Sequence, residues 1–306
     1  MIIAITDVIE LNSELHALGY SKLPKYRKAK VDRLKNIEDK RRSVAAGILL
    51  NAAVRQYVNS NKYNNESSNN AGSDDGHCEI HLVDIKEAVE KYDAEYDYEI
   101  DYCNNGKPCF KNGACQFNLS HAGRYAVCVV SACEVGVDIE GDRTCNDKVA
   151  RRFFTEGECE WIYKTKAMEE DKDISIVAKM ENKDSSYICS DNQDMRFFRI
   201  WTLKEAYSKV TGKGIAYGIN EAEFEVHNIE KNTEKNIKKN IKNNTGTHVQ
   251  IADRNEDATS GQWHELREFN EQQEIRFTDS TLDKQYGIVQ LCIDKHVISV
   301  VYKKDA

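Results

Sequence analysis

The sequence lacks several features that would assign it at once to a common class of protein. It contains no run of about 18 apolar residues, the length needed to cross a membrane as a helix. Residues 1–7 lack the basic and long apolar segments of a secretory signal peptide and instead have the pattern of a first β-strand. We therefore expect a soluble cytoplasmic protein that does not bind membranes.

Closely spaced cysteine pairs are also missing. The chain has ten cysteines, but none forms the Cys-x-x-Cys spacing of many zinc and redox sites. Cys128, Cys133 and Cys292 lie in apolar, strand-like runs, where a cysteine behaves as a small core residue. This distribution predicts a reducing cytoplasm rather than a disulfide framework.

A serine nucleophile is not indicated either. The sequence has no Gly-x-Ser-x-Gly elbow, and Ser120 and His121 are adjacent, a spacing that hardly allows them to act as nucleophile and base. A serine and an imidazole beside Gly123, just before an apolar strand, suit the binding of an anion better.

The length and the net charge of the chain limit its domain organisation and the ligands that it can bind. A chain of 306 residues predicts two structural units at about 150 residues each. The net charge of -8 argues against a general nucleic-acid binder. Residues 22–42 nevertheless hold ten Lys or Arg residues against three acids, which indicates one polyanionic ligand bound at one place.

Two long helices are expected. Residues 38–58 have an apolar stripe, and Arg41, Arg42 and Ser43 fall near the first turns, where backbone N–H groups favour phosphate; a solvated basic face is the alternative. Residues 197–211 form the second helix, which Gly212 ends. Polar, low-complexity inserts near residues 59–77, 165–195 and 228–265 are expected to be poorly ordered.

Residues 135–140 are the most informative stretch. Val135, Val137 and Ile139 alternate with Gly136, Asp138 and Glu140, which is typical of a strand with one buried face. The two carboxylates then lie about 7 Å apart on one face. They repel each other unless a cation lies between them, and Mg²⁺ is the hard cation that suits carboxylates and phosphates. A polar strand face in water is the alternative.

Two further patterns have both a structural and a chemical interpretation. Thr155 and Glu158 have the spacing of a capping box at the start of a helix. Glu205 and Lys209 are four residues apart in the second long helix and share one face, as an ordinary surface ion pair would.

Five motifs occur in a fixed order along the chain: Gly106-Lys107-Pro108, Phe117-Asn118-Leu119-Ser120-His121-x-Gly123, Gly136-Val137-Asp138-Ile139-Glu140, Arg152-Phe153-Phe154-Thr155-x-x-Glu158, and Trp201-x-x-Lys204-Glu205-Ala206-x-x-Lys209-x-x-Gly212-Lys213-Gly214. In this order they resemble the 4′-phosphopantetheinyl transferases, and among these the large monomeric type typified by the surfactin-synthetase activator. The resemblance covers about residues 27–43 and 106–214, with a weaker likeness in the final strands.

The resemblance implies an α+β fold, a pseudo-dimer of two similar α+β halves with coenzyme A in the cleft between them. The first half would span residues 1–132 and carry the basic segment. The second half would span residues 133–306 and carry the metal ligands. The boundary is expected near residues 130–135.

The family also implies roles for particular residues. Asp138, Glu140 and Glu205 resemble the ligands of Mg²⁺, with Mn²⁺ as a possible substitute, and the metal would bind the pyrophosphate of coenzyme A. Glu158 resembles the base that deprotonates the attacking serine, directly or through water. Lys209 would stabilise or protonate the departing phosphate, and a catalytic role is also implied for His121.

Further positions resemble contacts to coenzyme A, and these are Arg27, Lys30, Arg42, Ser43, Lys107, Pro108, Ser120, His121 and Lys209. The match is looser in the basic segment. The family pattern has lysine where Arg27 falls, threonine at Ser43 and histidine at Arg41.

The implied reaction moves 4′-phosphopantetheine from coenzyme A to a serine of an acyl, peptidyl or aryl carrier protein, giving holo-carrier protein and 3′,5′-ADP. The carrier is expected to be a small acidic helical domain that docks near residues 146–160, where Phe153, Phe154 and Trp161 offer apolar contacts or belong to the core. The alternatives are a Mg²⁺-dependent pyrophosphatase acting on coenzyme A or nucleotides, and a non-catalytic coenzyme-A-binding module. No Gly-x₅-Glu-x₇-Arg-Glu hydrolase box is present. We expect a monomer.

Overall fold

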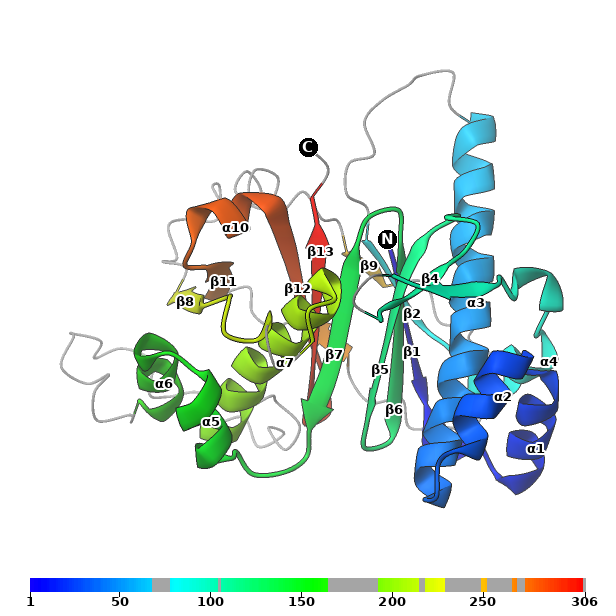
Figure 1. Ribbon diagram of the computed structural model, residues 1–306, viewed down its shortest axis with the longest axis horizontal. Coiled ribbons are helices and arrows are strands. Elements are labelled where there is room, and N and C mark those ends of the chain that lie inside the picture. Colours follow the sequence, from blue (N-terminus) through cyan, green and yellow to red (C-terminus); the bar gives the residue numbers. More distant parts are fainter. Residues whose placement is uncertain are drawn as a thin grey trace, which may run out of the picture.

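The computed structural model describes residues 1–67, 78–103, 106–164, 192–214, 218–228, 249–251, 266–268 and 273–304. In these residues the chain has two central β-sheets with helices on their outer sides, which confirms the expected α+β class (Figure 1). Within the same residues, none of the helices combines the length and apolarity required for a membrane span. The similarity of the two halves and the boundary between them stay predictions.

The first sheet is built from the N-terminal part of the chain and one late strand. Its order is β5 (Gln116–Ala122), β6 (Tyr125–Ser131), β1 (Ile2–Asp7), β2 (Cys78–Leu82) and β9 (Val249–Ile251). Strand β1 runs parallel to β2 and antiparallel to β6. Its outer side is covered by α3 (Ile37–Ser67), with α1 (Ser13–Lys22), α2 (Lys25–Asp32) and α4 (Ile85–Glu90) packed beside α3.

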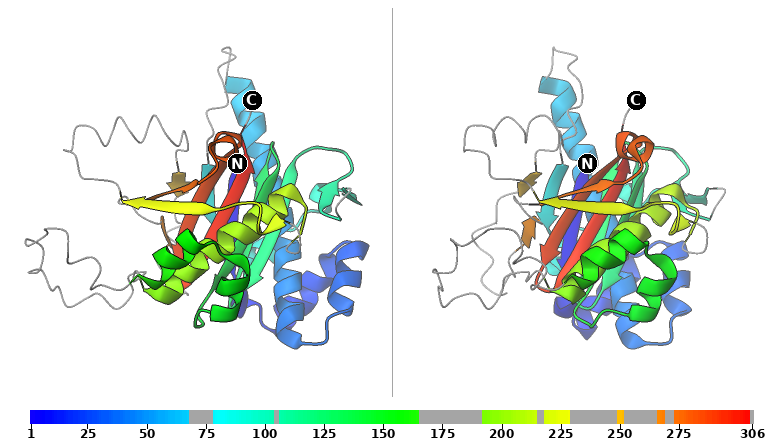
Figure 2. Two further views of the ribbon diagram at one scale, coloured as in Figure 1. Left: turned by 60° about the vertical axis from the view of Figure 1, so that its left-hand side comes forward. Right: turned by 90° about the vertical axis from the view of Figure 1, so that its left-hand side faces the viewer.

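The second sheet is antiparallel. Its order is β10 (Leu266–Glu268), β12 (Tyr286–Ile293), β13 (His296–Lys303) and β7 (Val135–Gly141), so β7 is an edge strand. Helix α7 (Gln193–Thr211) crosses its outer face, and α5 (Asp147–Phe153) and α6 (Glu156–Tyr163) lie beside α7 (Figure 2). The remaining elements are the hairpin β3 (Ile100–Tyr102) and β4 (Pro108–Phe110), the pair β8 (Phe224–Asn228) and β11 (Gln273–Phe277), α10 (Ser280–Gln285), and the 3₁₀ turns Val8–Glu10 and Ala94–Tyr96.

The inner sides of the two sheets share one apolar core. Val127 and Val129 of β6 point into this core, whereas Ala126 and Cys128 face the helices around α3. Val137 of β7 joins the same inner core. Because successive side chains of a strand point to opposite faces, strands buried on both sides are apolar throughout, as the sequence of β6 is.

Helix α7 is more deeply buried than the single apolar stripe in its sequence predicts. Arg196, Arg199 and Lys204 are all buried along it. Each has internal partners: Arg196 donates to the carbonyl oxygens of Ile162 and Lys164, and the Nε of Arg199 donates to Gln290. A charged side chain is tolerated inside a protein when its hydrogen-bonding groups are satisfied in this way.

Two expectations need correction. Helix α3 continues to Ser67, so the insert expected from residue 59 starts later; once a helix is nucleated it propagates through sequence that contains no Gly or Pro, as residues 59–67 do. Cys292 lies in the core, as expected, but it is disulfide-bonded rather than a free thiol. Residues 68–77, 165–191, 229–248 and 252–265 of the expected inserts lie outside the described residues.

The contact between α7 and β7 depends on Gly136. A Cβ atom at this position would lie 2.1 Å from the carbonyl oxygen of Ala206 and 2.5 Å from the backbone nitrogen of Val210. Both distances are shorter than any real van der Waals contact, so only glycine allows the helix to lie this close to the strand.

Replacing Gly136 with alanine is therefore expected to destabilise the protein by about 2–3 kcal/mol, because the backbone of α7 must move away from the sheet. Urea unfolding followed by circular dichroism measures the change. The matched control is Gly157→Ala in α6, where a Cβ would meet only Glu223 Oε1 at 3.6 Å. This control is expected to change stability by less than about 1 kcal/mol. Equal unfolding midpoints for the two variants would contradict the close-approach argument.

Candidate active site

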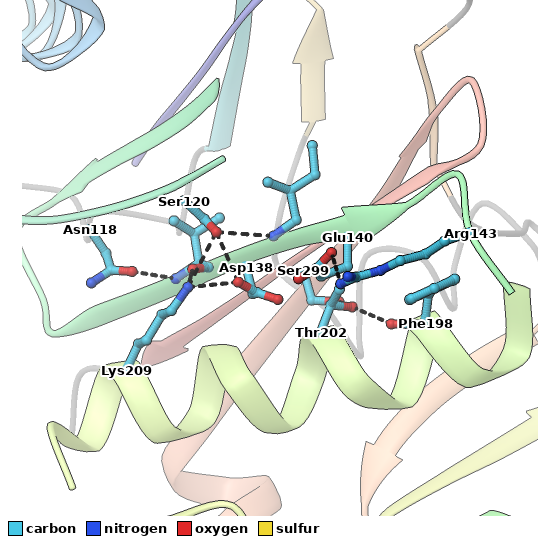
Figure 3. Close-up of polar contacts among 11 residues, drawn as sticks. Asn118, Ser120, Asp138, Glu140, Arg143, Phe198, Thr202, Lys209 and Ser299 are labelled. Carbon is cyan, nitrogen blue, oxygen red and sulfur yellow. Dashed lines mark hydrogen bonds and ion pairs between the residues drawn. The ribbon is translucent and has the colours of Figure 1, made fainter. Parts of the chain in front are cut away.

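The candidate site lies where α7, β7 and β5 meet, and Asp138 is at its centre (Figure 3). Asp138 Oδ1 accepts hydrogen bonds from Lys209 Nζ at 2.6 Å and from Ser120 Oγ at 2.8 Å. The residue is 6% exposed. One carboxylate oxygen therefore joins residues from a strand of the first sheet, a strand of the second sheet and the helix.

Strand β5 holds β7 in place through side chains. One side of β7 pairs with β13, and on its other side the N–H groups of Val137 and Ile139 donate to Asn118 Oδ1 at 3.0 Å and Ser120 Oγ at 3.4 Å. Unpaired backbone groups at a sheet edge must be satisfied, and here the partners come from the edge strand of the other sheet. This contact fixes the position of Asp138 relative to β5.

Glu140 and Glu205 complete an acidic cluster. Burial first, and then repulsion from Asp138, raise the pKa of Glu140, while its contact with Arg143 opposes this rise. Burial and repulsion from Asp138 and Glu140 raise the pKa of Glu205 to about 7, against the attraction of Lys209. Asp138 thus lies close enough to Glu140 and Glu205 to raise the pKa of both, and the sequence pattern predicted this proximity for Glu140.

The carboxylate oxygens of the acidic cluster are suitable ligands for a cation. Asp138 Oδ2 is buried and has no hydrogen-bond partner among the described residues. A buried carboxylate oxygen without a partner is costly, and a divalent cation is the ligand that would satisfy it. In the same part of the chain, no three His, Cys, Asp or Glu side chains already converge into a metal cage. Glu140, which now contacts Arg143, would have to turn inward to bind the ion.

Lys209 supplies positive charge at the carboxylates. Besides Asp138, its Nζ donates to the carbonyl oxygen of Val137 at 3.0 Å and to Ser120 Oγ at 3.2 Å. Its side chain is 28% exposed, so the ammonium lies at the boundary between the acidic cluster and solvent. Glu205 and Lys209 therefore belong to the site rather than to an isolated surface pair.

A group of basic residues comes from α2 and α3. Arg27 is 6% exposed and one of its terminal nitrogens donates to the carbonyl oxygen of Ser43 at 2.8 Å. Arg27 Nε and Ser43 Oγ are buried without hydrogen-bond partners among the described residues. Burial and the charge of Arg27 lower the pKa of Lys30. These groups suit an anion with several oxygen acceptors.

His121 links the basic group to the acidic cluster. Desolvation by the surrounding groups, and then the positive charges of Arg42, Lys30 and Lys209, lower the pKa of His121, although the residue as a whole is exposed. Arg42 itself bonds Asp39 at 2.7 Å and the carbonyl oxygen of Gly123 at 3.2 Å, which joins α3 to the turn after β5. The fold thus brings Lys30 and Arg42 close enough to His121 for their charges to act on it together with that of Lys209.

Lys107 and Pro108 lie at a different edge of the site. Pro108 begins β4, and Lys107 Nζ donates to the carbonyl oxygens of Val135 at 2.9 Å and Val210 at 3.4 Å. Burial lowers the pKa of Lys107. The lysine therefore connects the hairpin β3–β4 to the start of β7 and to the last turn of α7, where a helix dipole favours a cation.

Glu158 lies in a closed ion pair instead of the acidic cluster. Its Oε2 accepts from Lys204 Nζ at 3.0 Å and from the Thr155 N–H at 2.9 Å, and its Oε1 accepts from the Phe224 N–H at 3.0 Å. The side chains of Glu158 and Lys204 are 0% and 1% exposed. The predicted capping box with Thr155 is confirmed. The predicted role as a base stays a prediction, and a carboxylate enclosed in this way also has a structural role.

Sequence reasoning missed four residues that shape the site: Asn118, Gly136, Arg143 and Lys204. Lys204 directly precedes Glu205, and Asn118 lies in the same motif as Ser120, so motif membership was the available signal. Arg143 contacts Glu140 three residues away, whereas the partners of the other three are distant in sequence and no local pattern identifies them. The aromatic residues Phe154 and Trp161 are half-buried and pack against the core around α7.

The Glu158–Lys204 pair makes a testable prediction about stability. Glu158→Gln and Lys204→Met should each cost about 3 kcal/mol, because each leaves the other charge buried without its partner. The double variant should cost less than the sum by at least about 1 kcal/mol. Urea unfolding of the four proteins gives the coupling.

The control is the exposed pair of Lys213 and Glu221, whose side chains are 47% and 39% exposed. Glu221→Gln should cost less than about 1 kcal/mol. A Glu158→Gln variant as stable as the wild type would show that the carboxylate is not needed for the fold and would strengthen its predicted role as a base.

Comparison with known proteins bears on the second half of the chain. Residues 134–264 match the model of the 4′-phosphopantetheinyl transferase superfamily. The chain is 32% identical over 117 residues to 4′-phosphopantetheinyl transferase psf-1 of Bacillus pumilus, covering 38% of this chain and 40% of that protein. It is 26% identical over 123 residues to 4′-phosphopantetheinyl transferase Sfp of Bacillus subtilis, covering 40% of this chain and 45% of that protein.

A third relative is 4′-phosphopantetheinyl transferase gsp of Aneurinibacillus migulanus, 34% identical over 115 residues and covering 38% of each chain. The aligned part of the chain thus spans less than half the length of these three relatives. The matched family region includes Asp138, Glu140, Glu158, Glu205 and Lys209, but not the basic residues of α2 and α3. Residues 134–264 are thus similar to the 4′-phosphopantetheinyl transferase superfamily, and the similarity to psf-1, Sfp and gsp agrees with the Sfp-like type that the order of the sequence motifs predicted.

Proposed function

We propose that the protein transfers 4′-phosphopantetheine from coenzyme A to the hydroxyl of a serine on a carrier protein, releasing 3′,5′-ADP. The observation that carries this proposal is the carboxylate of Asp138. One of its oxygens is bound by Lys209 and Ser120, and the other is buried and unsatisfied. Cleaving a pyrophosphate requires positive charge beside the phosphates, and this geometry can supply it from a metal and a lysine.

Asp138, Glu140 and Glu205 would hold a divalent cation, Mg²⁺ or Mn²⁺. When bound, the cation neutralises the pyrophosphate of coenzyme A and stabilises the charge that develops as the bond to the leaving phosphate breaks. The unsatisfied oxygen of Asp138 and the raised pKa values of Glu140 and Glu205 support this assignment, since all three reflect negative charge without enough compensation.

The basic residues would bind the phosphates of coenzyme A. Arg27, Lys30, Arg42 and Ser43 come from α2 and α3, and His121 from β5. Buried donors that lack partners, Arg27 Nε and Ser43 Oγ, support a ligand rich in phosphate oxygens. Lys107 and Pro108 would contribute from the β3–β4 hairpin.

Lys209 would act on the leaving group. Its ammonium is 2.6 Å from Asp138 Oδ1. By turning its protons toward the departing 3′,5′-ADP phosphate, the lysine would stabilise or protonate it. Glu158 is proposed as the base for the serine only if the Lys204 pair opens, because its oxygens are otherwise occupied.

The direct test is the intact mass of an apo carrier protein after incubation with this protein, coenzyme A and Mg²⁺. A gain of about 340 Da on the carrier, the mass of phosphopantetheine, is expected, with a rate at least about 100-fold lower for Asp138→Asn. The matched control is Asp142→Asn, which removes a carboxylate that is 65% exposed at the end of the same strand. Asp142→Asn should leave the rate unchanged.

Each of the other outcomes of this experiment would indicate a different interpretation. Cleavage of coenzyme A without a carrier protein would indicate a pyrophosphatase. Binding of coenzyme A without modification of any of several carriers would overturn the transferase and leave a binding module. Loss of activity in both Asp138→Asn and Asp142→Asn would show that the effect is not specific to the acidic cluster.

Glu205 predicts a pH dependence of stability in the metal-free protein. Its pKa is 4.5 when unperturbed and about 7 in the folded protein, so folding is favoured by proton uptake between these values. This contribution is complete below about pH 4.5 and is lost as the pH rises through about 7.

With EDTA present, wild-type protein should therefore lose more thermal stability between pH 5 and pH 8 than Glu205→Gln does, measured by differential scanning calorimetry. Adding Mg²⁺ at pH 8 should restore stability to the wild type and less to the variant. Parallel pH profiles for the two proteins would contradict the raised pKa of Glu205.

A further inference from the structure

The hairpin β3–β4 carries two cysteines on one face. Strand pairing sets Asp101 opposite Cys109 and Tyr102 opposite Pro108, and the N–H of Cys103 donates to the carbonyl oxygen of Lys107 at 2.9 Å. Since side chains two residues apart share a face, Cys103 lies on the face of Asp101 and is the diagonal neighbour of Cys109. Both thiols are free, and the Cys103 side chain raises the pKa of the Cys109 thiol.

The two thiols differ in their access to solvent. Cys103 is exposed, as are its neighbours Asp101 and Tyr102, whereas Cys109 is half-buried. The neighbouring Cys103 side chain, and then burial, raise the pKa of Cys109 to about 11, so its thiol stays protonated at neutral pH. Cys103 is therefore the thiol that a reagent in solution meets first, and Cys109 is held within reach of it.

The two cysteines flank a residue of the candidate site along the chain. Lys107 lies between the two cysteines, and its ammonium reaches the carbonyl oxygens of Val135 and Val210. A change in the spacing of the hairpin strands at this end therefore moves the backbone that carries Lys107.

We propose that Cys103 and Cys109 form a reversible redox pair, oxidised by low-molecular-weight disulfides, and that oxidation weakens the binding of coenzyme A by displacing Lys107. The second part rests on the proposed function. The first part does not, because it concerns only the chemistry of the hairpin.

The chemistry is two successive thiol–disulfide exchanges. The Cys103 thiolate attacks one sulfur of glutathione disulfide, forming a mixed disulfide and releasing one glutathione thiolate. Cys109 then attacks the Cys103 sulfur, its proton passes to the second departing glutathione, and the intramolecular disulfide forms. The two protein thiols are oxidised and one glutathione disulfide is reduced to two glutathione molecules. Excess dithiothreitol reverses both steps.

The physical consequence follows from the length of a disulfide. An S–S bond of about 2.05 Å draws the two sulfurs closer than a thiol hydrogen bond does. The strands of the hairpin must tighten at the position of Lys107, and the lysine no longer reaches its present partners. Loss of one charge-assisted contact to a phosphate is expected to weaken binding by about tenfold.

The test uses the full chain, treated with glutathione disulfide, blocked with N-ethylmaleimide and digested with trypsin. Lys107 precedes a proline and is not cleaved, so one tryptic peptide, residues 92–111, contains both cysteines. In wild-type protein this peptide should be about 2 Da lighter than its reduced form and unreactive to N-ethylmaleimide. In Cys109→Ser the exchange should stop at the mixed disulfide, adding about 305 Da to the peptide.

Cys103→Ser should give neither product in this peptide, and Cys133→Ser, which changes a half-buried cysteine elsewhere, should behave as the wild type does. A wild-type peptide that keeps two reactive thiols, or a Cys109→Ser peptide without the adduct, would overturn the redox pair.

Calorimetric titration with coenzyme A tests the second part. The dissociation constant should rise about tenfold on oxidation of the wild type and of Cys133→Ser, return with dithiothreitol, and stay constant in Cys103→Ser. A bridged peptide with unchanged affinity would overturn the control of binding. If reduced wild-type protein neither binds coenzyme A nor modifies a carrier, the proposed function fails, while the peptide masses still decide whether the redox pair exists.

Discussion

The close approach of helix α7 to strand β7 is the constraint on which the site depends. It requires that residue 136 be a glycine, because a Cβ at Gly136 would lie 2.1 Å from the Ala206 carbonyl oxygen. Two residues further along β7, Asp138 faces the helix, and on the helix Glu205 and Lys209 lie near it. A strand and a helix held further apart would leave these charges separated by water, and neither the raised pKa of Glu205 nor the short contact of Lys209 would exist.

Adjacent residues of α7 have opposite electrostatic surroundings. Lys204 is fully enclosed with Glu158, and its hydrogen bonds extend to the carbonyl oxygen of Ala222 at 2.8 Å, so its charge is compensated inside the protein. Glu205 faces two other carboxylates and has its pKa raised to about 7. The helix thus separates a closed ion pair, which joins α6 to the core, from a cluster with surplus negative charge. Functional sites often retain uncompensated charge of this kind, whereas a buried structural ion pair compensates it.

The site also depends on both sheets. Ser120 and Asn118 from the first sheet hydrogen-bond the free side of β7 in the second, and Arg42 reaches the turn that follows β5. The shared core between the sheets, with residues such as Ile5 and Val300, keeps the two edges in register. Because the basic residues come from one side and the carboxylates from the other, a ligand with several phosphates would bridge them. Lys107, which lies between the two cysteines of the β3–β4 hairpin, connects this hairpin to the edge of the site.

The sequence by itself determined the local elements and the chemistry of the motifs. The strand over residues 135–140, the capping box at Thr155 and Glu158, and the helix ended by Gly212 all follow from near neighbours, and the structure has each of them, although the strand is buried on both faces rather than one. Tertiary structure alone decided which charges meet. Lys204 pairs with Glu158, which is 46 positions away, and Lys209 contacts Asp138, which is 71 positions away. The side chain of Asn118 accepts from the backbone of β7 at a residue 19 positions away. Local patterns carry no information about such pairs, because their energies arise from burial and close packing that exist only once both sheets are assembled.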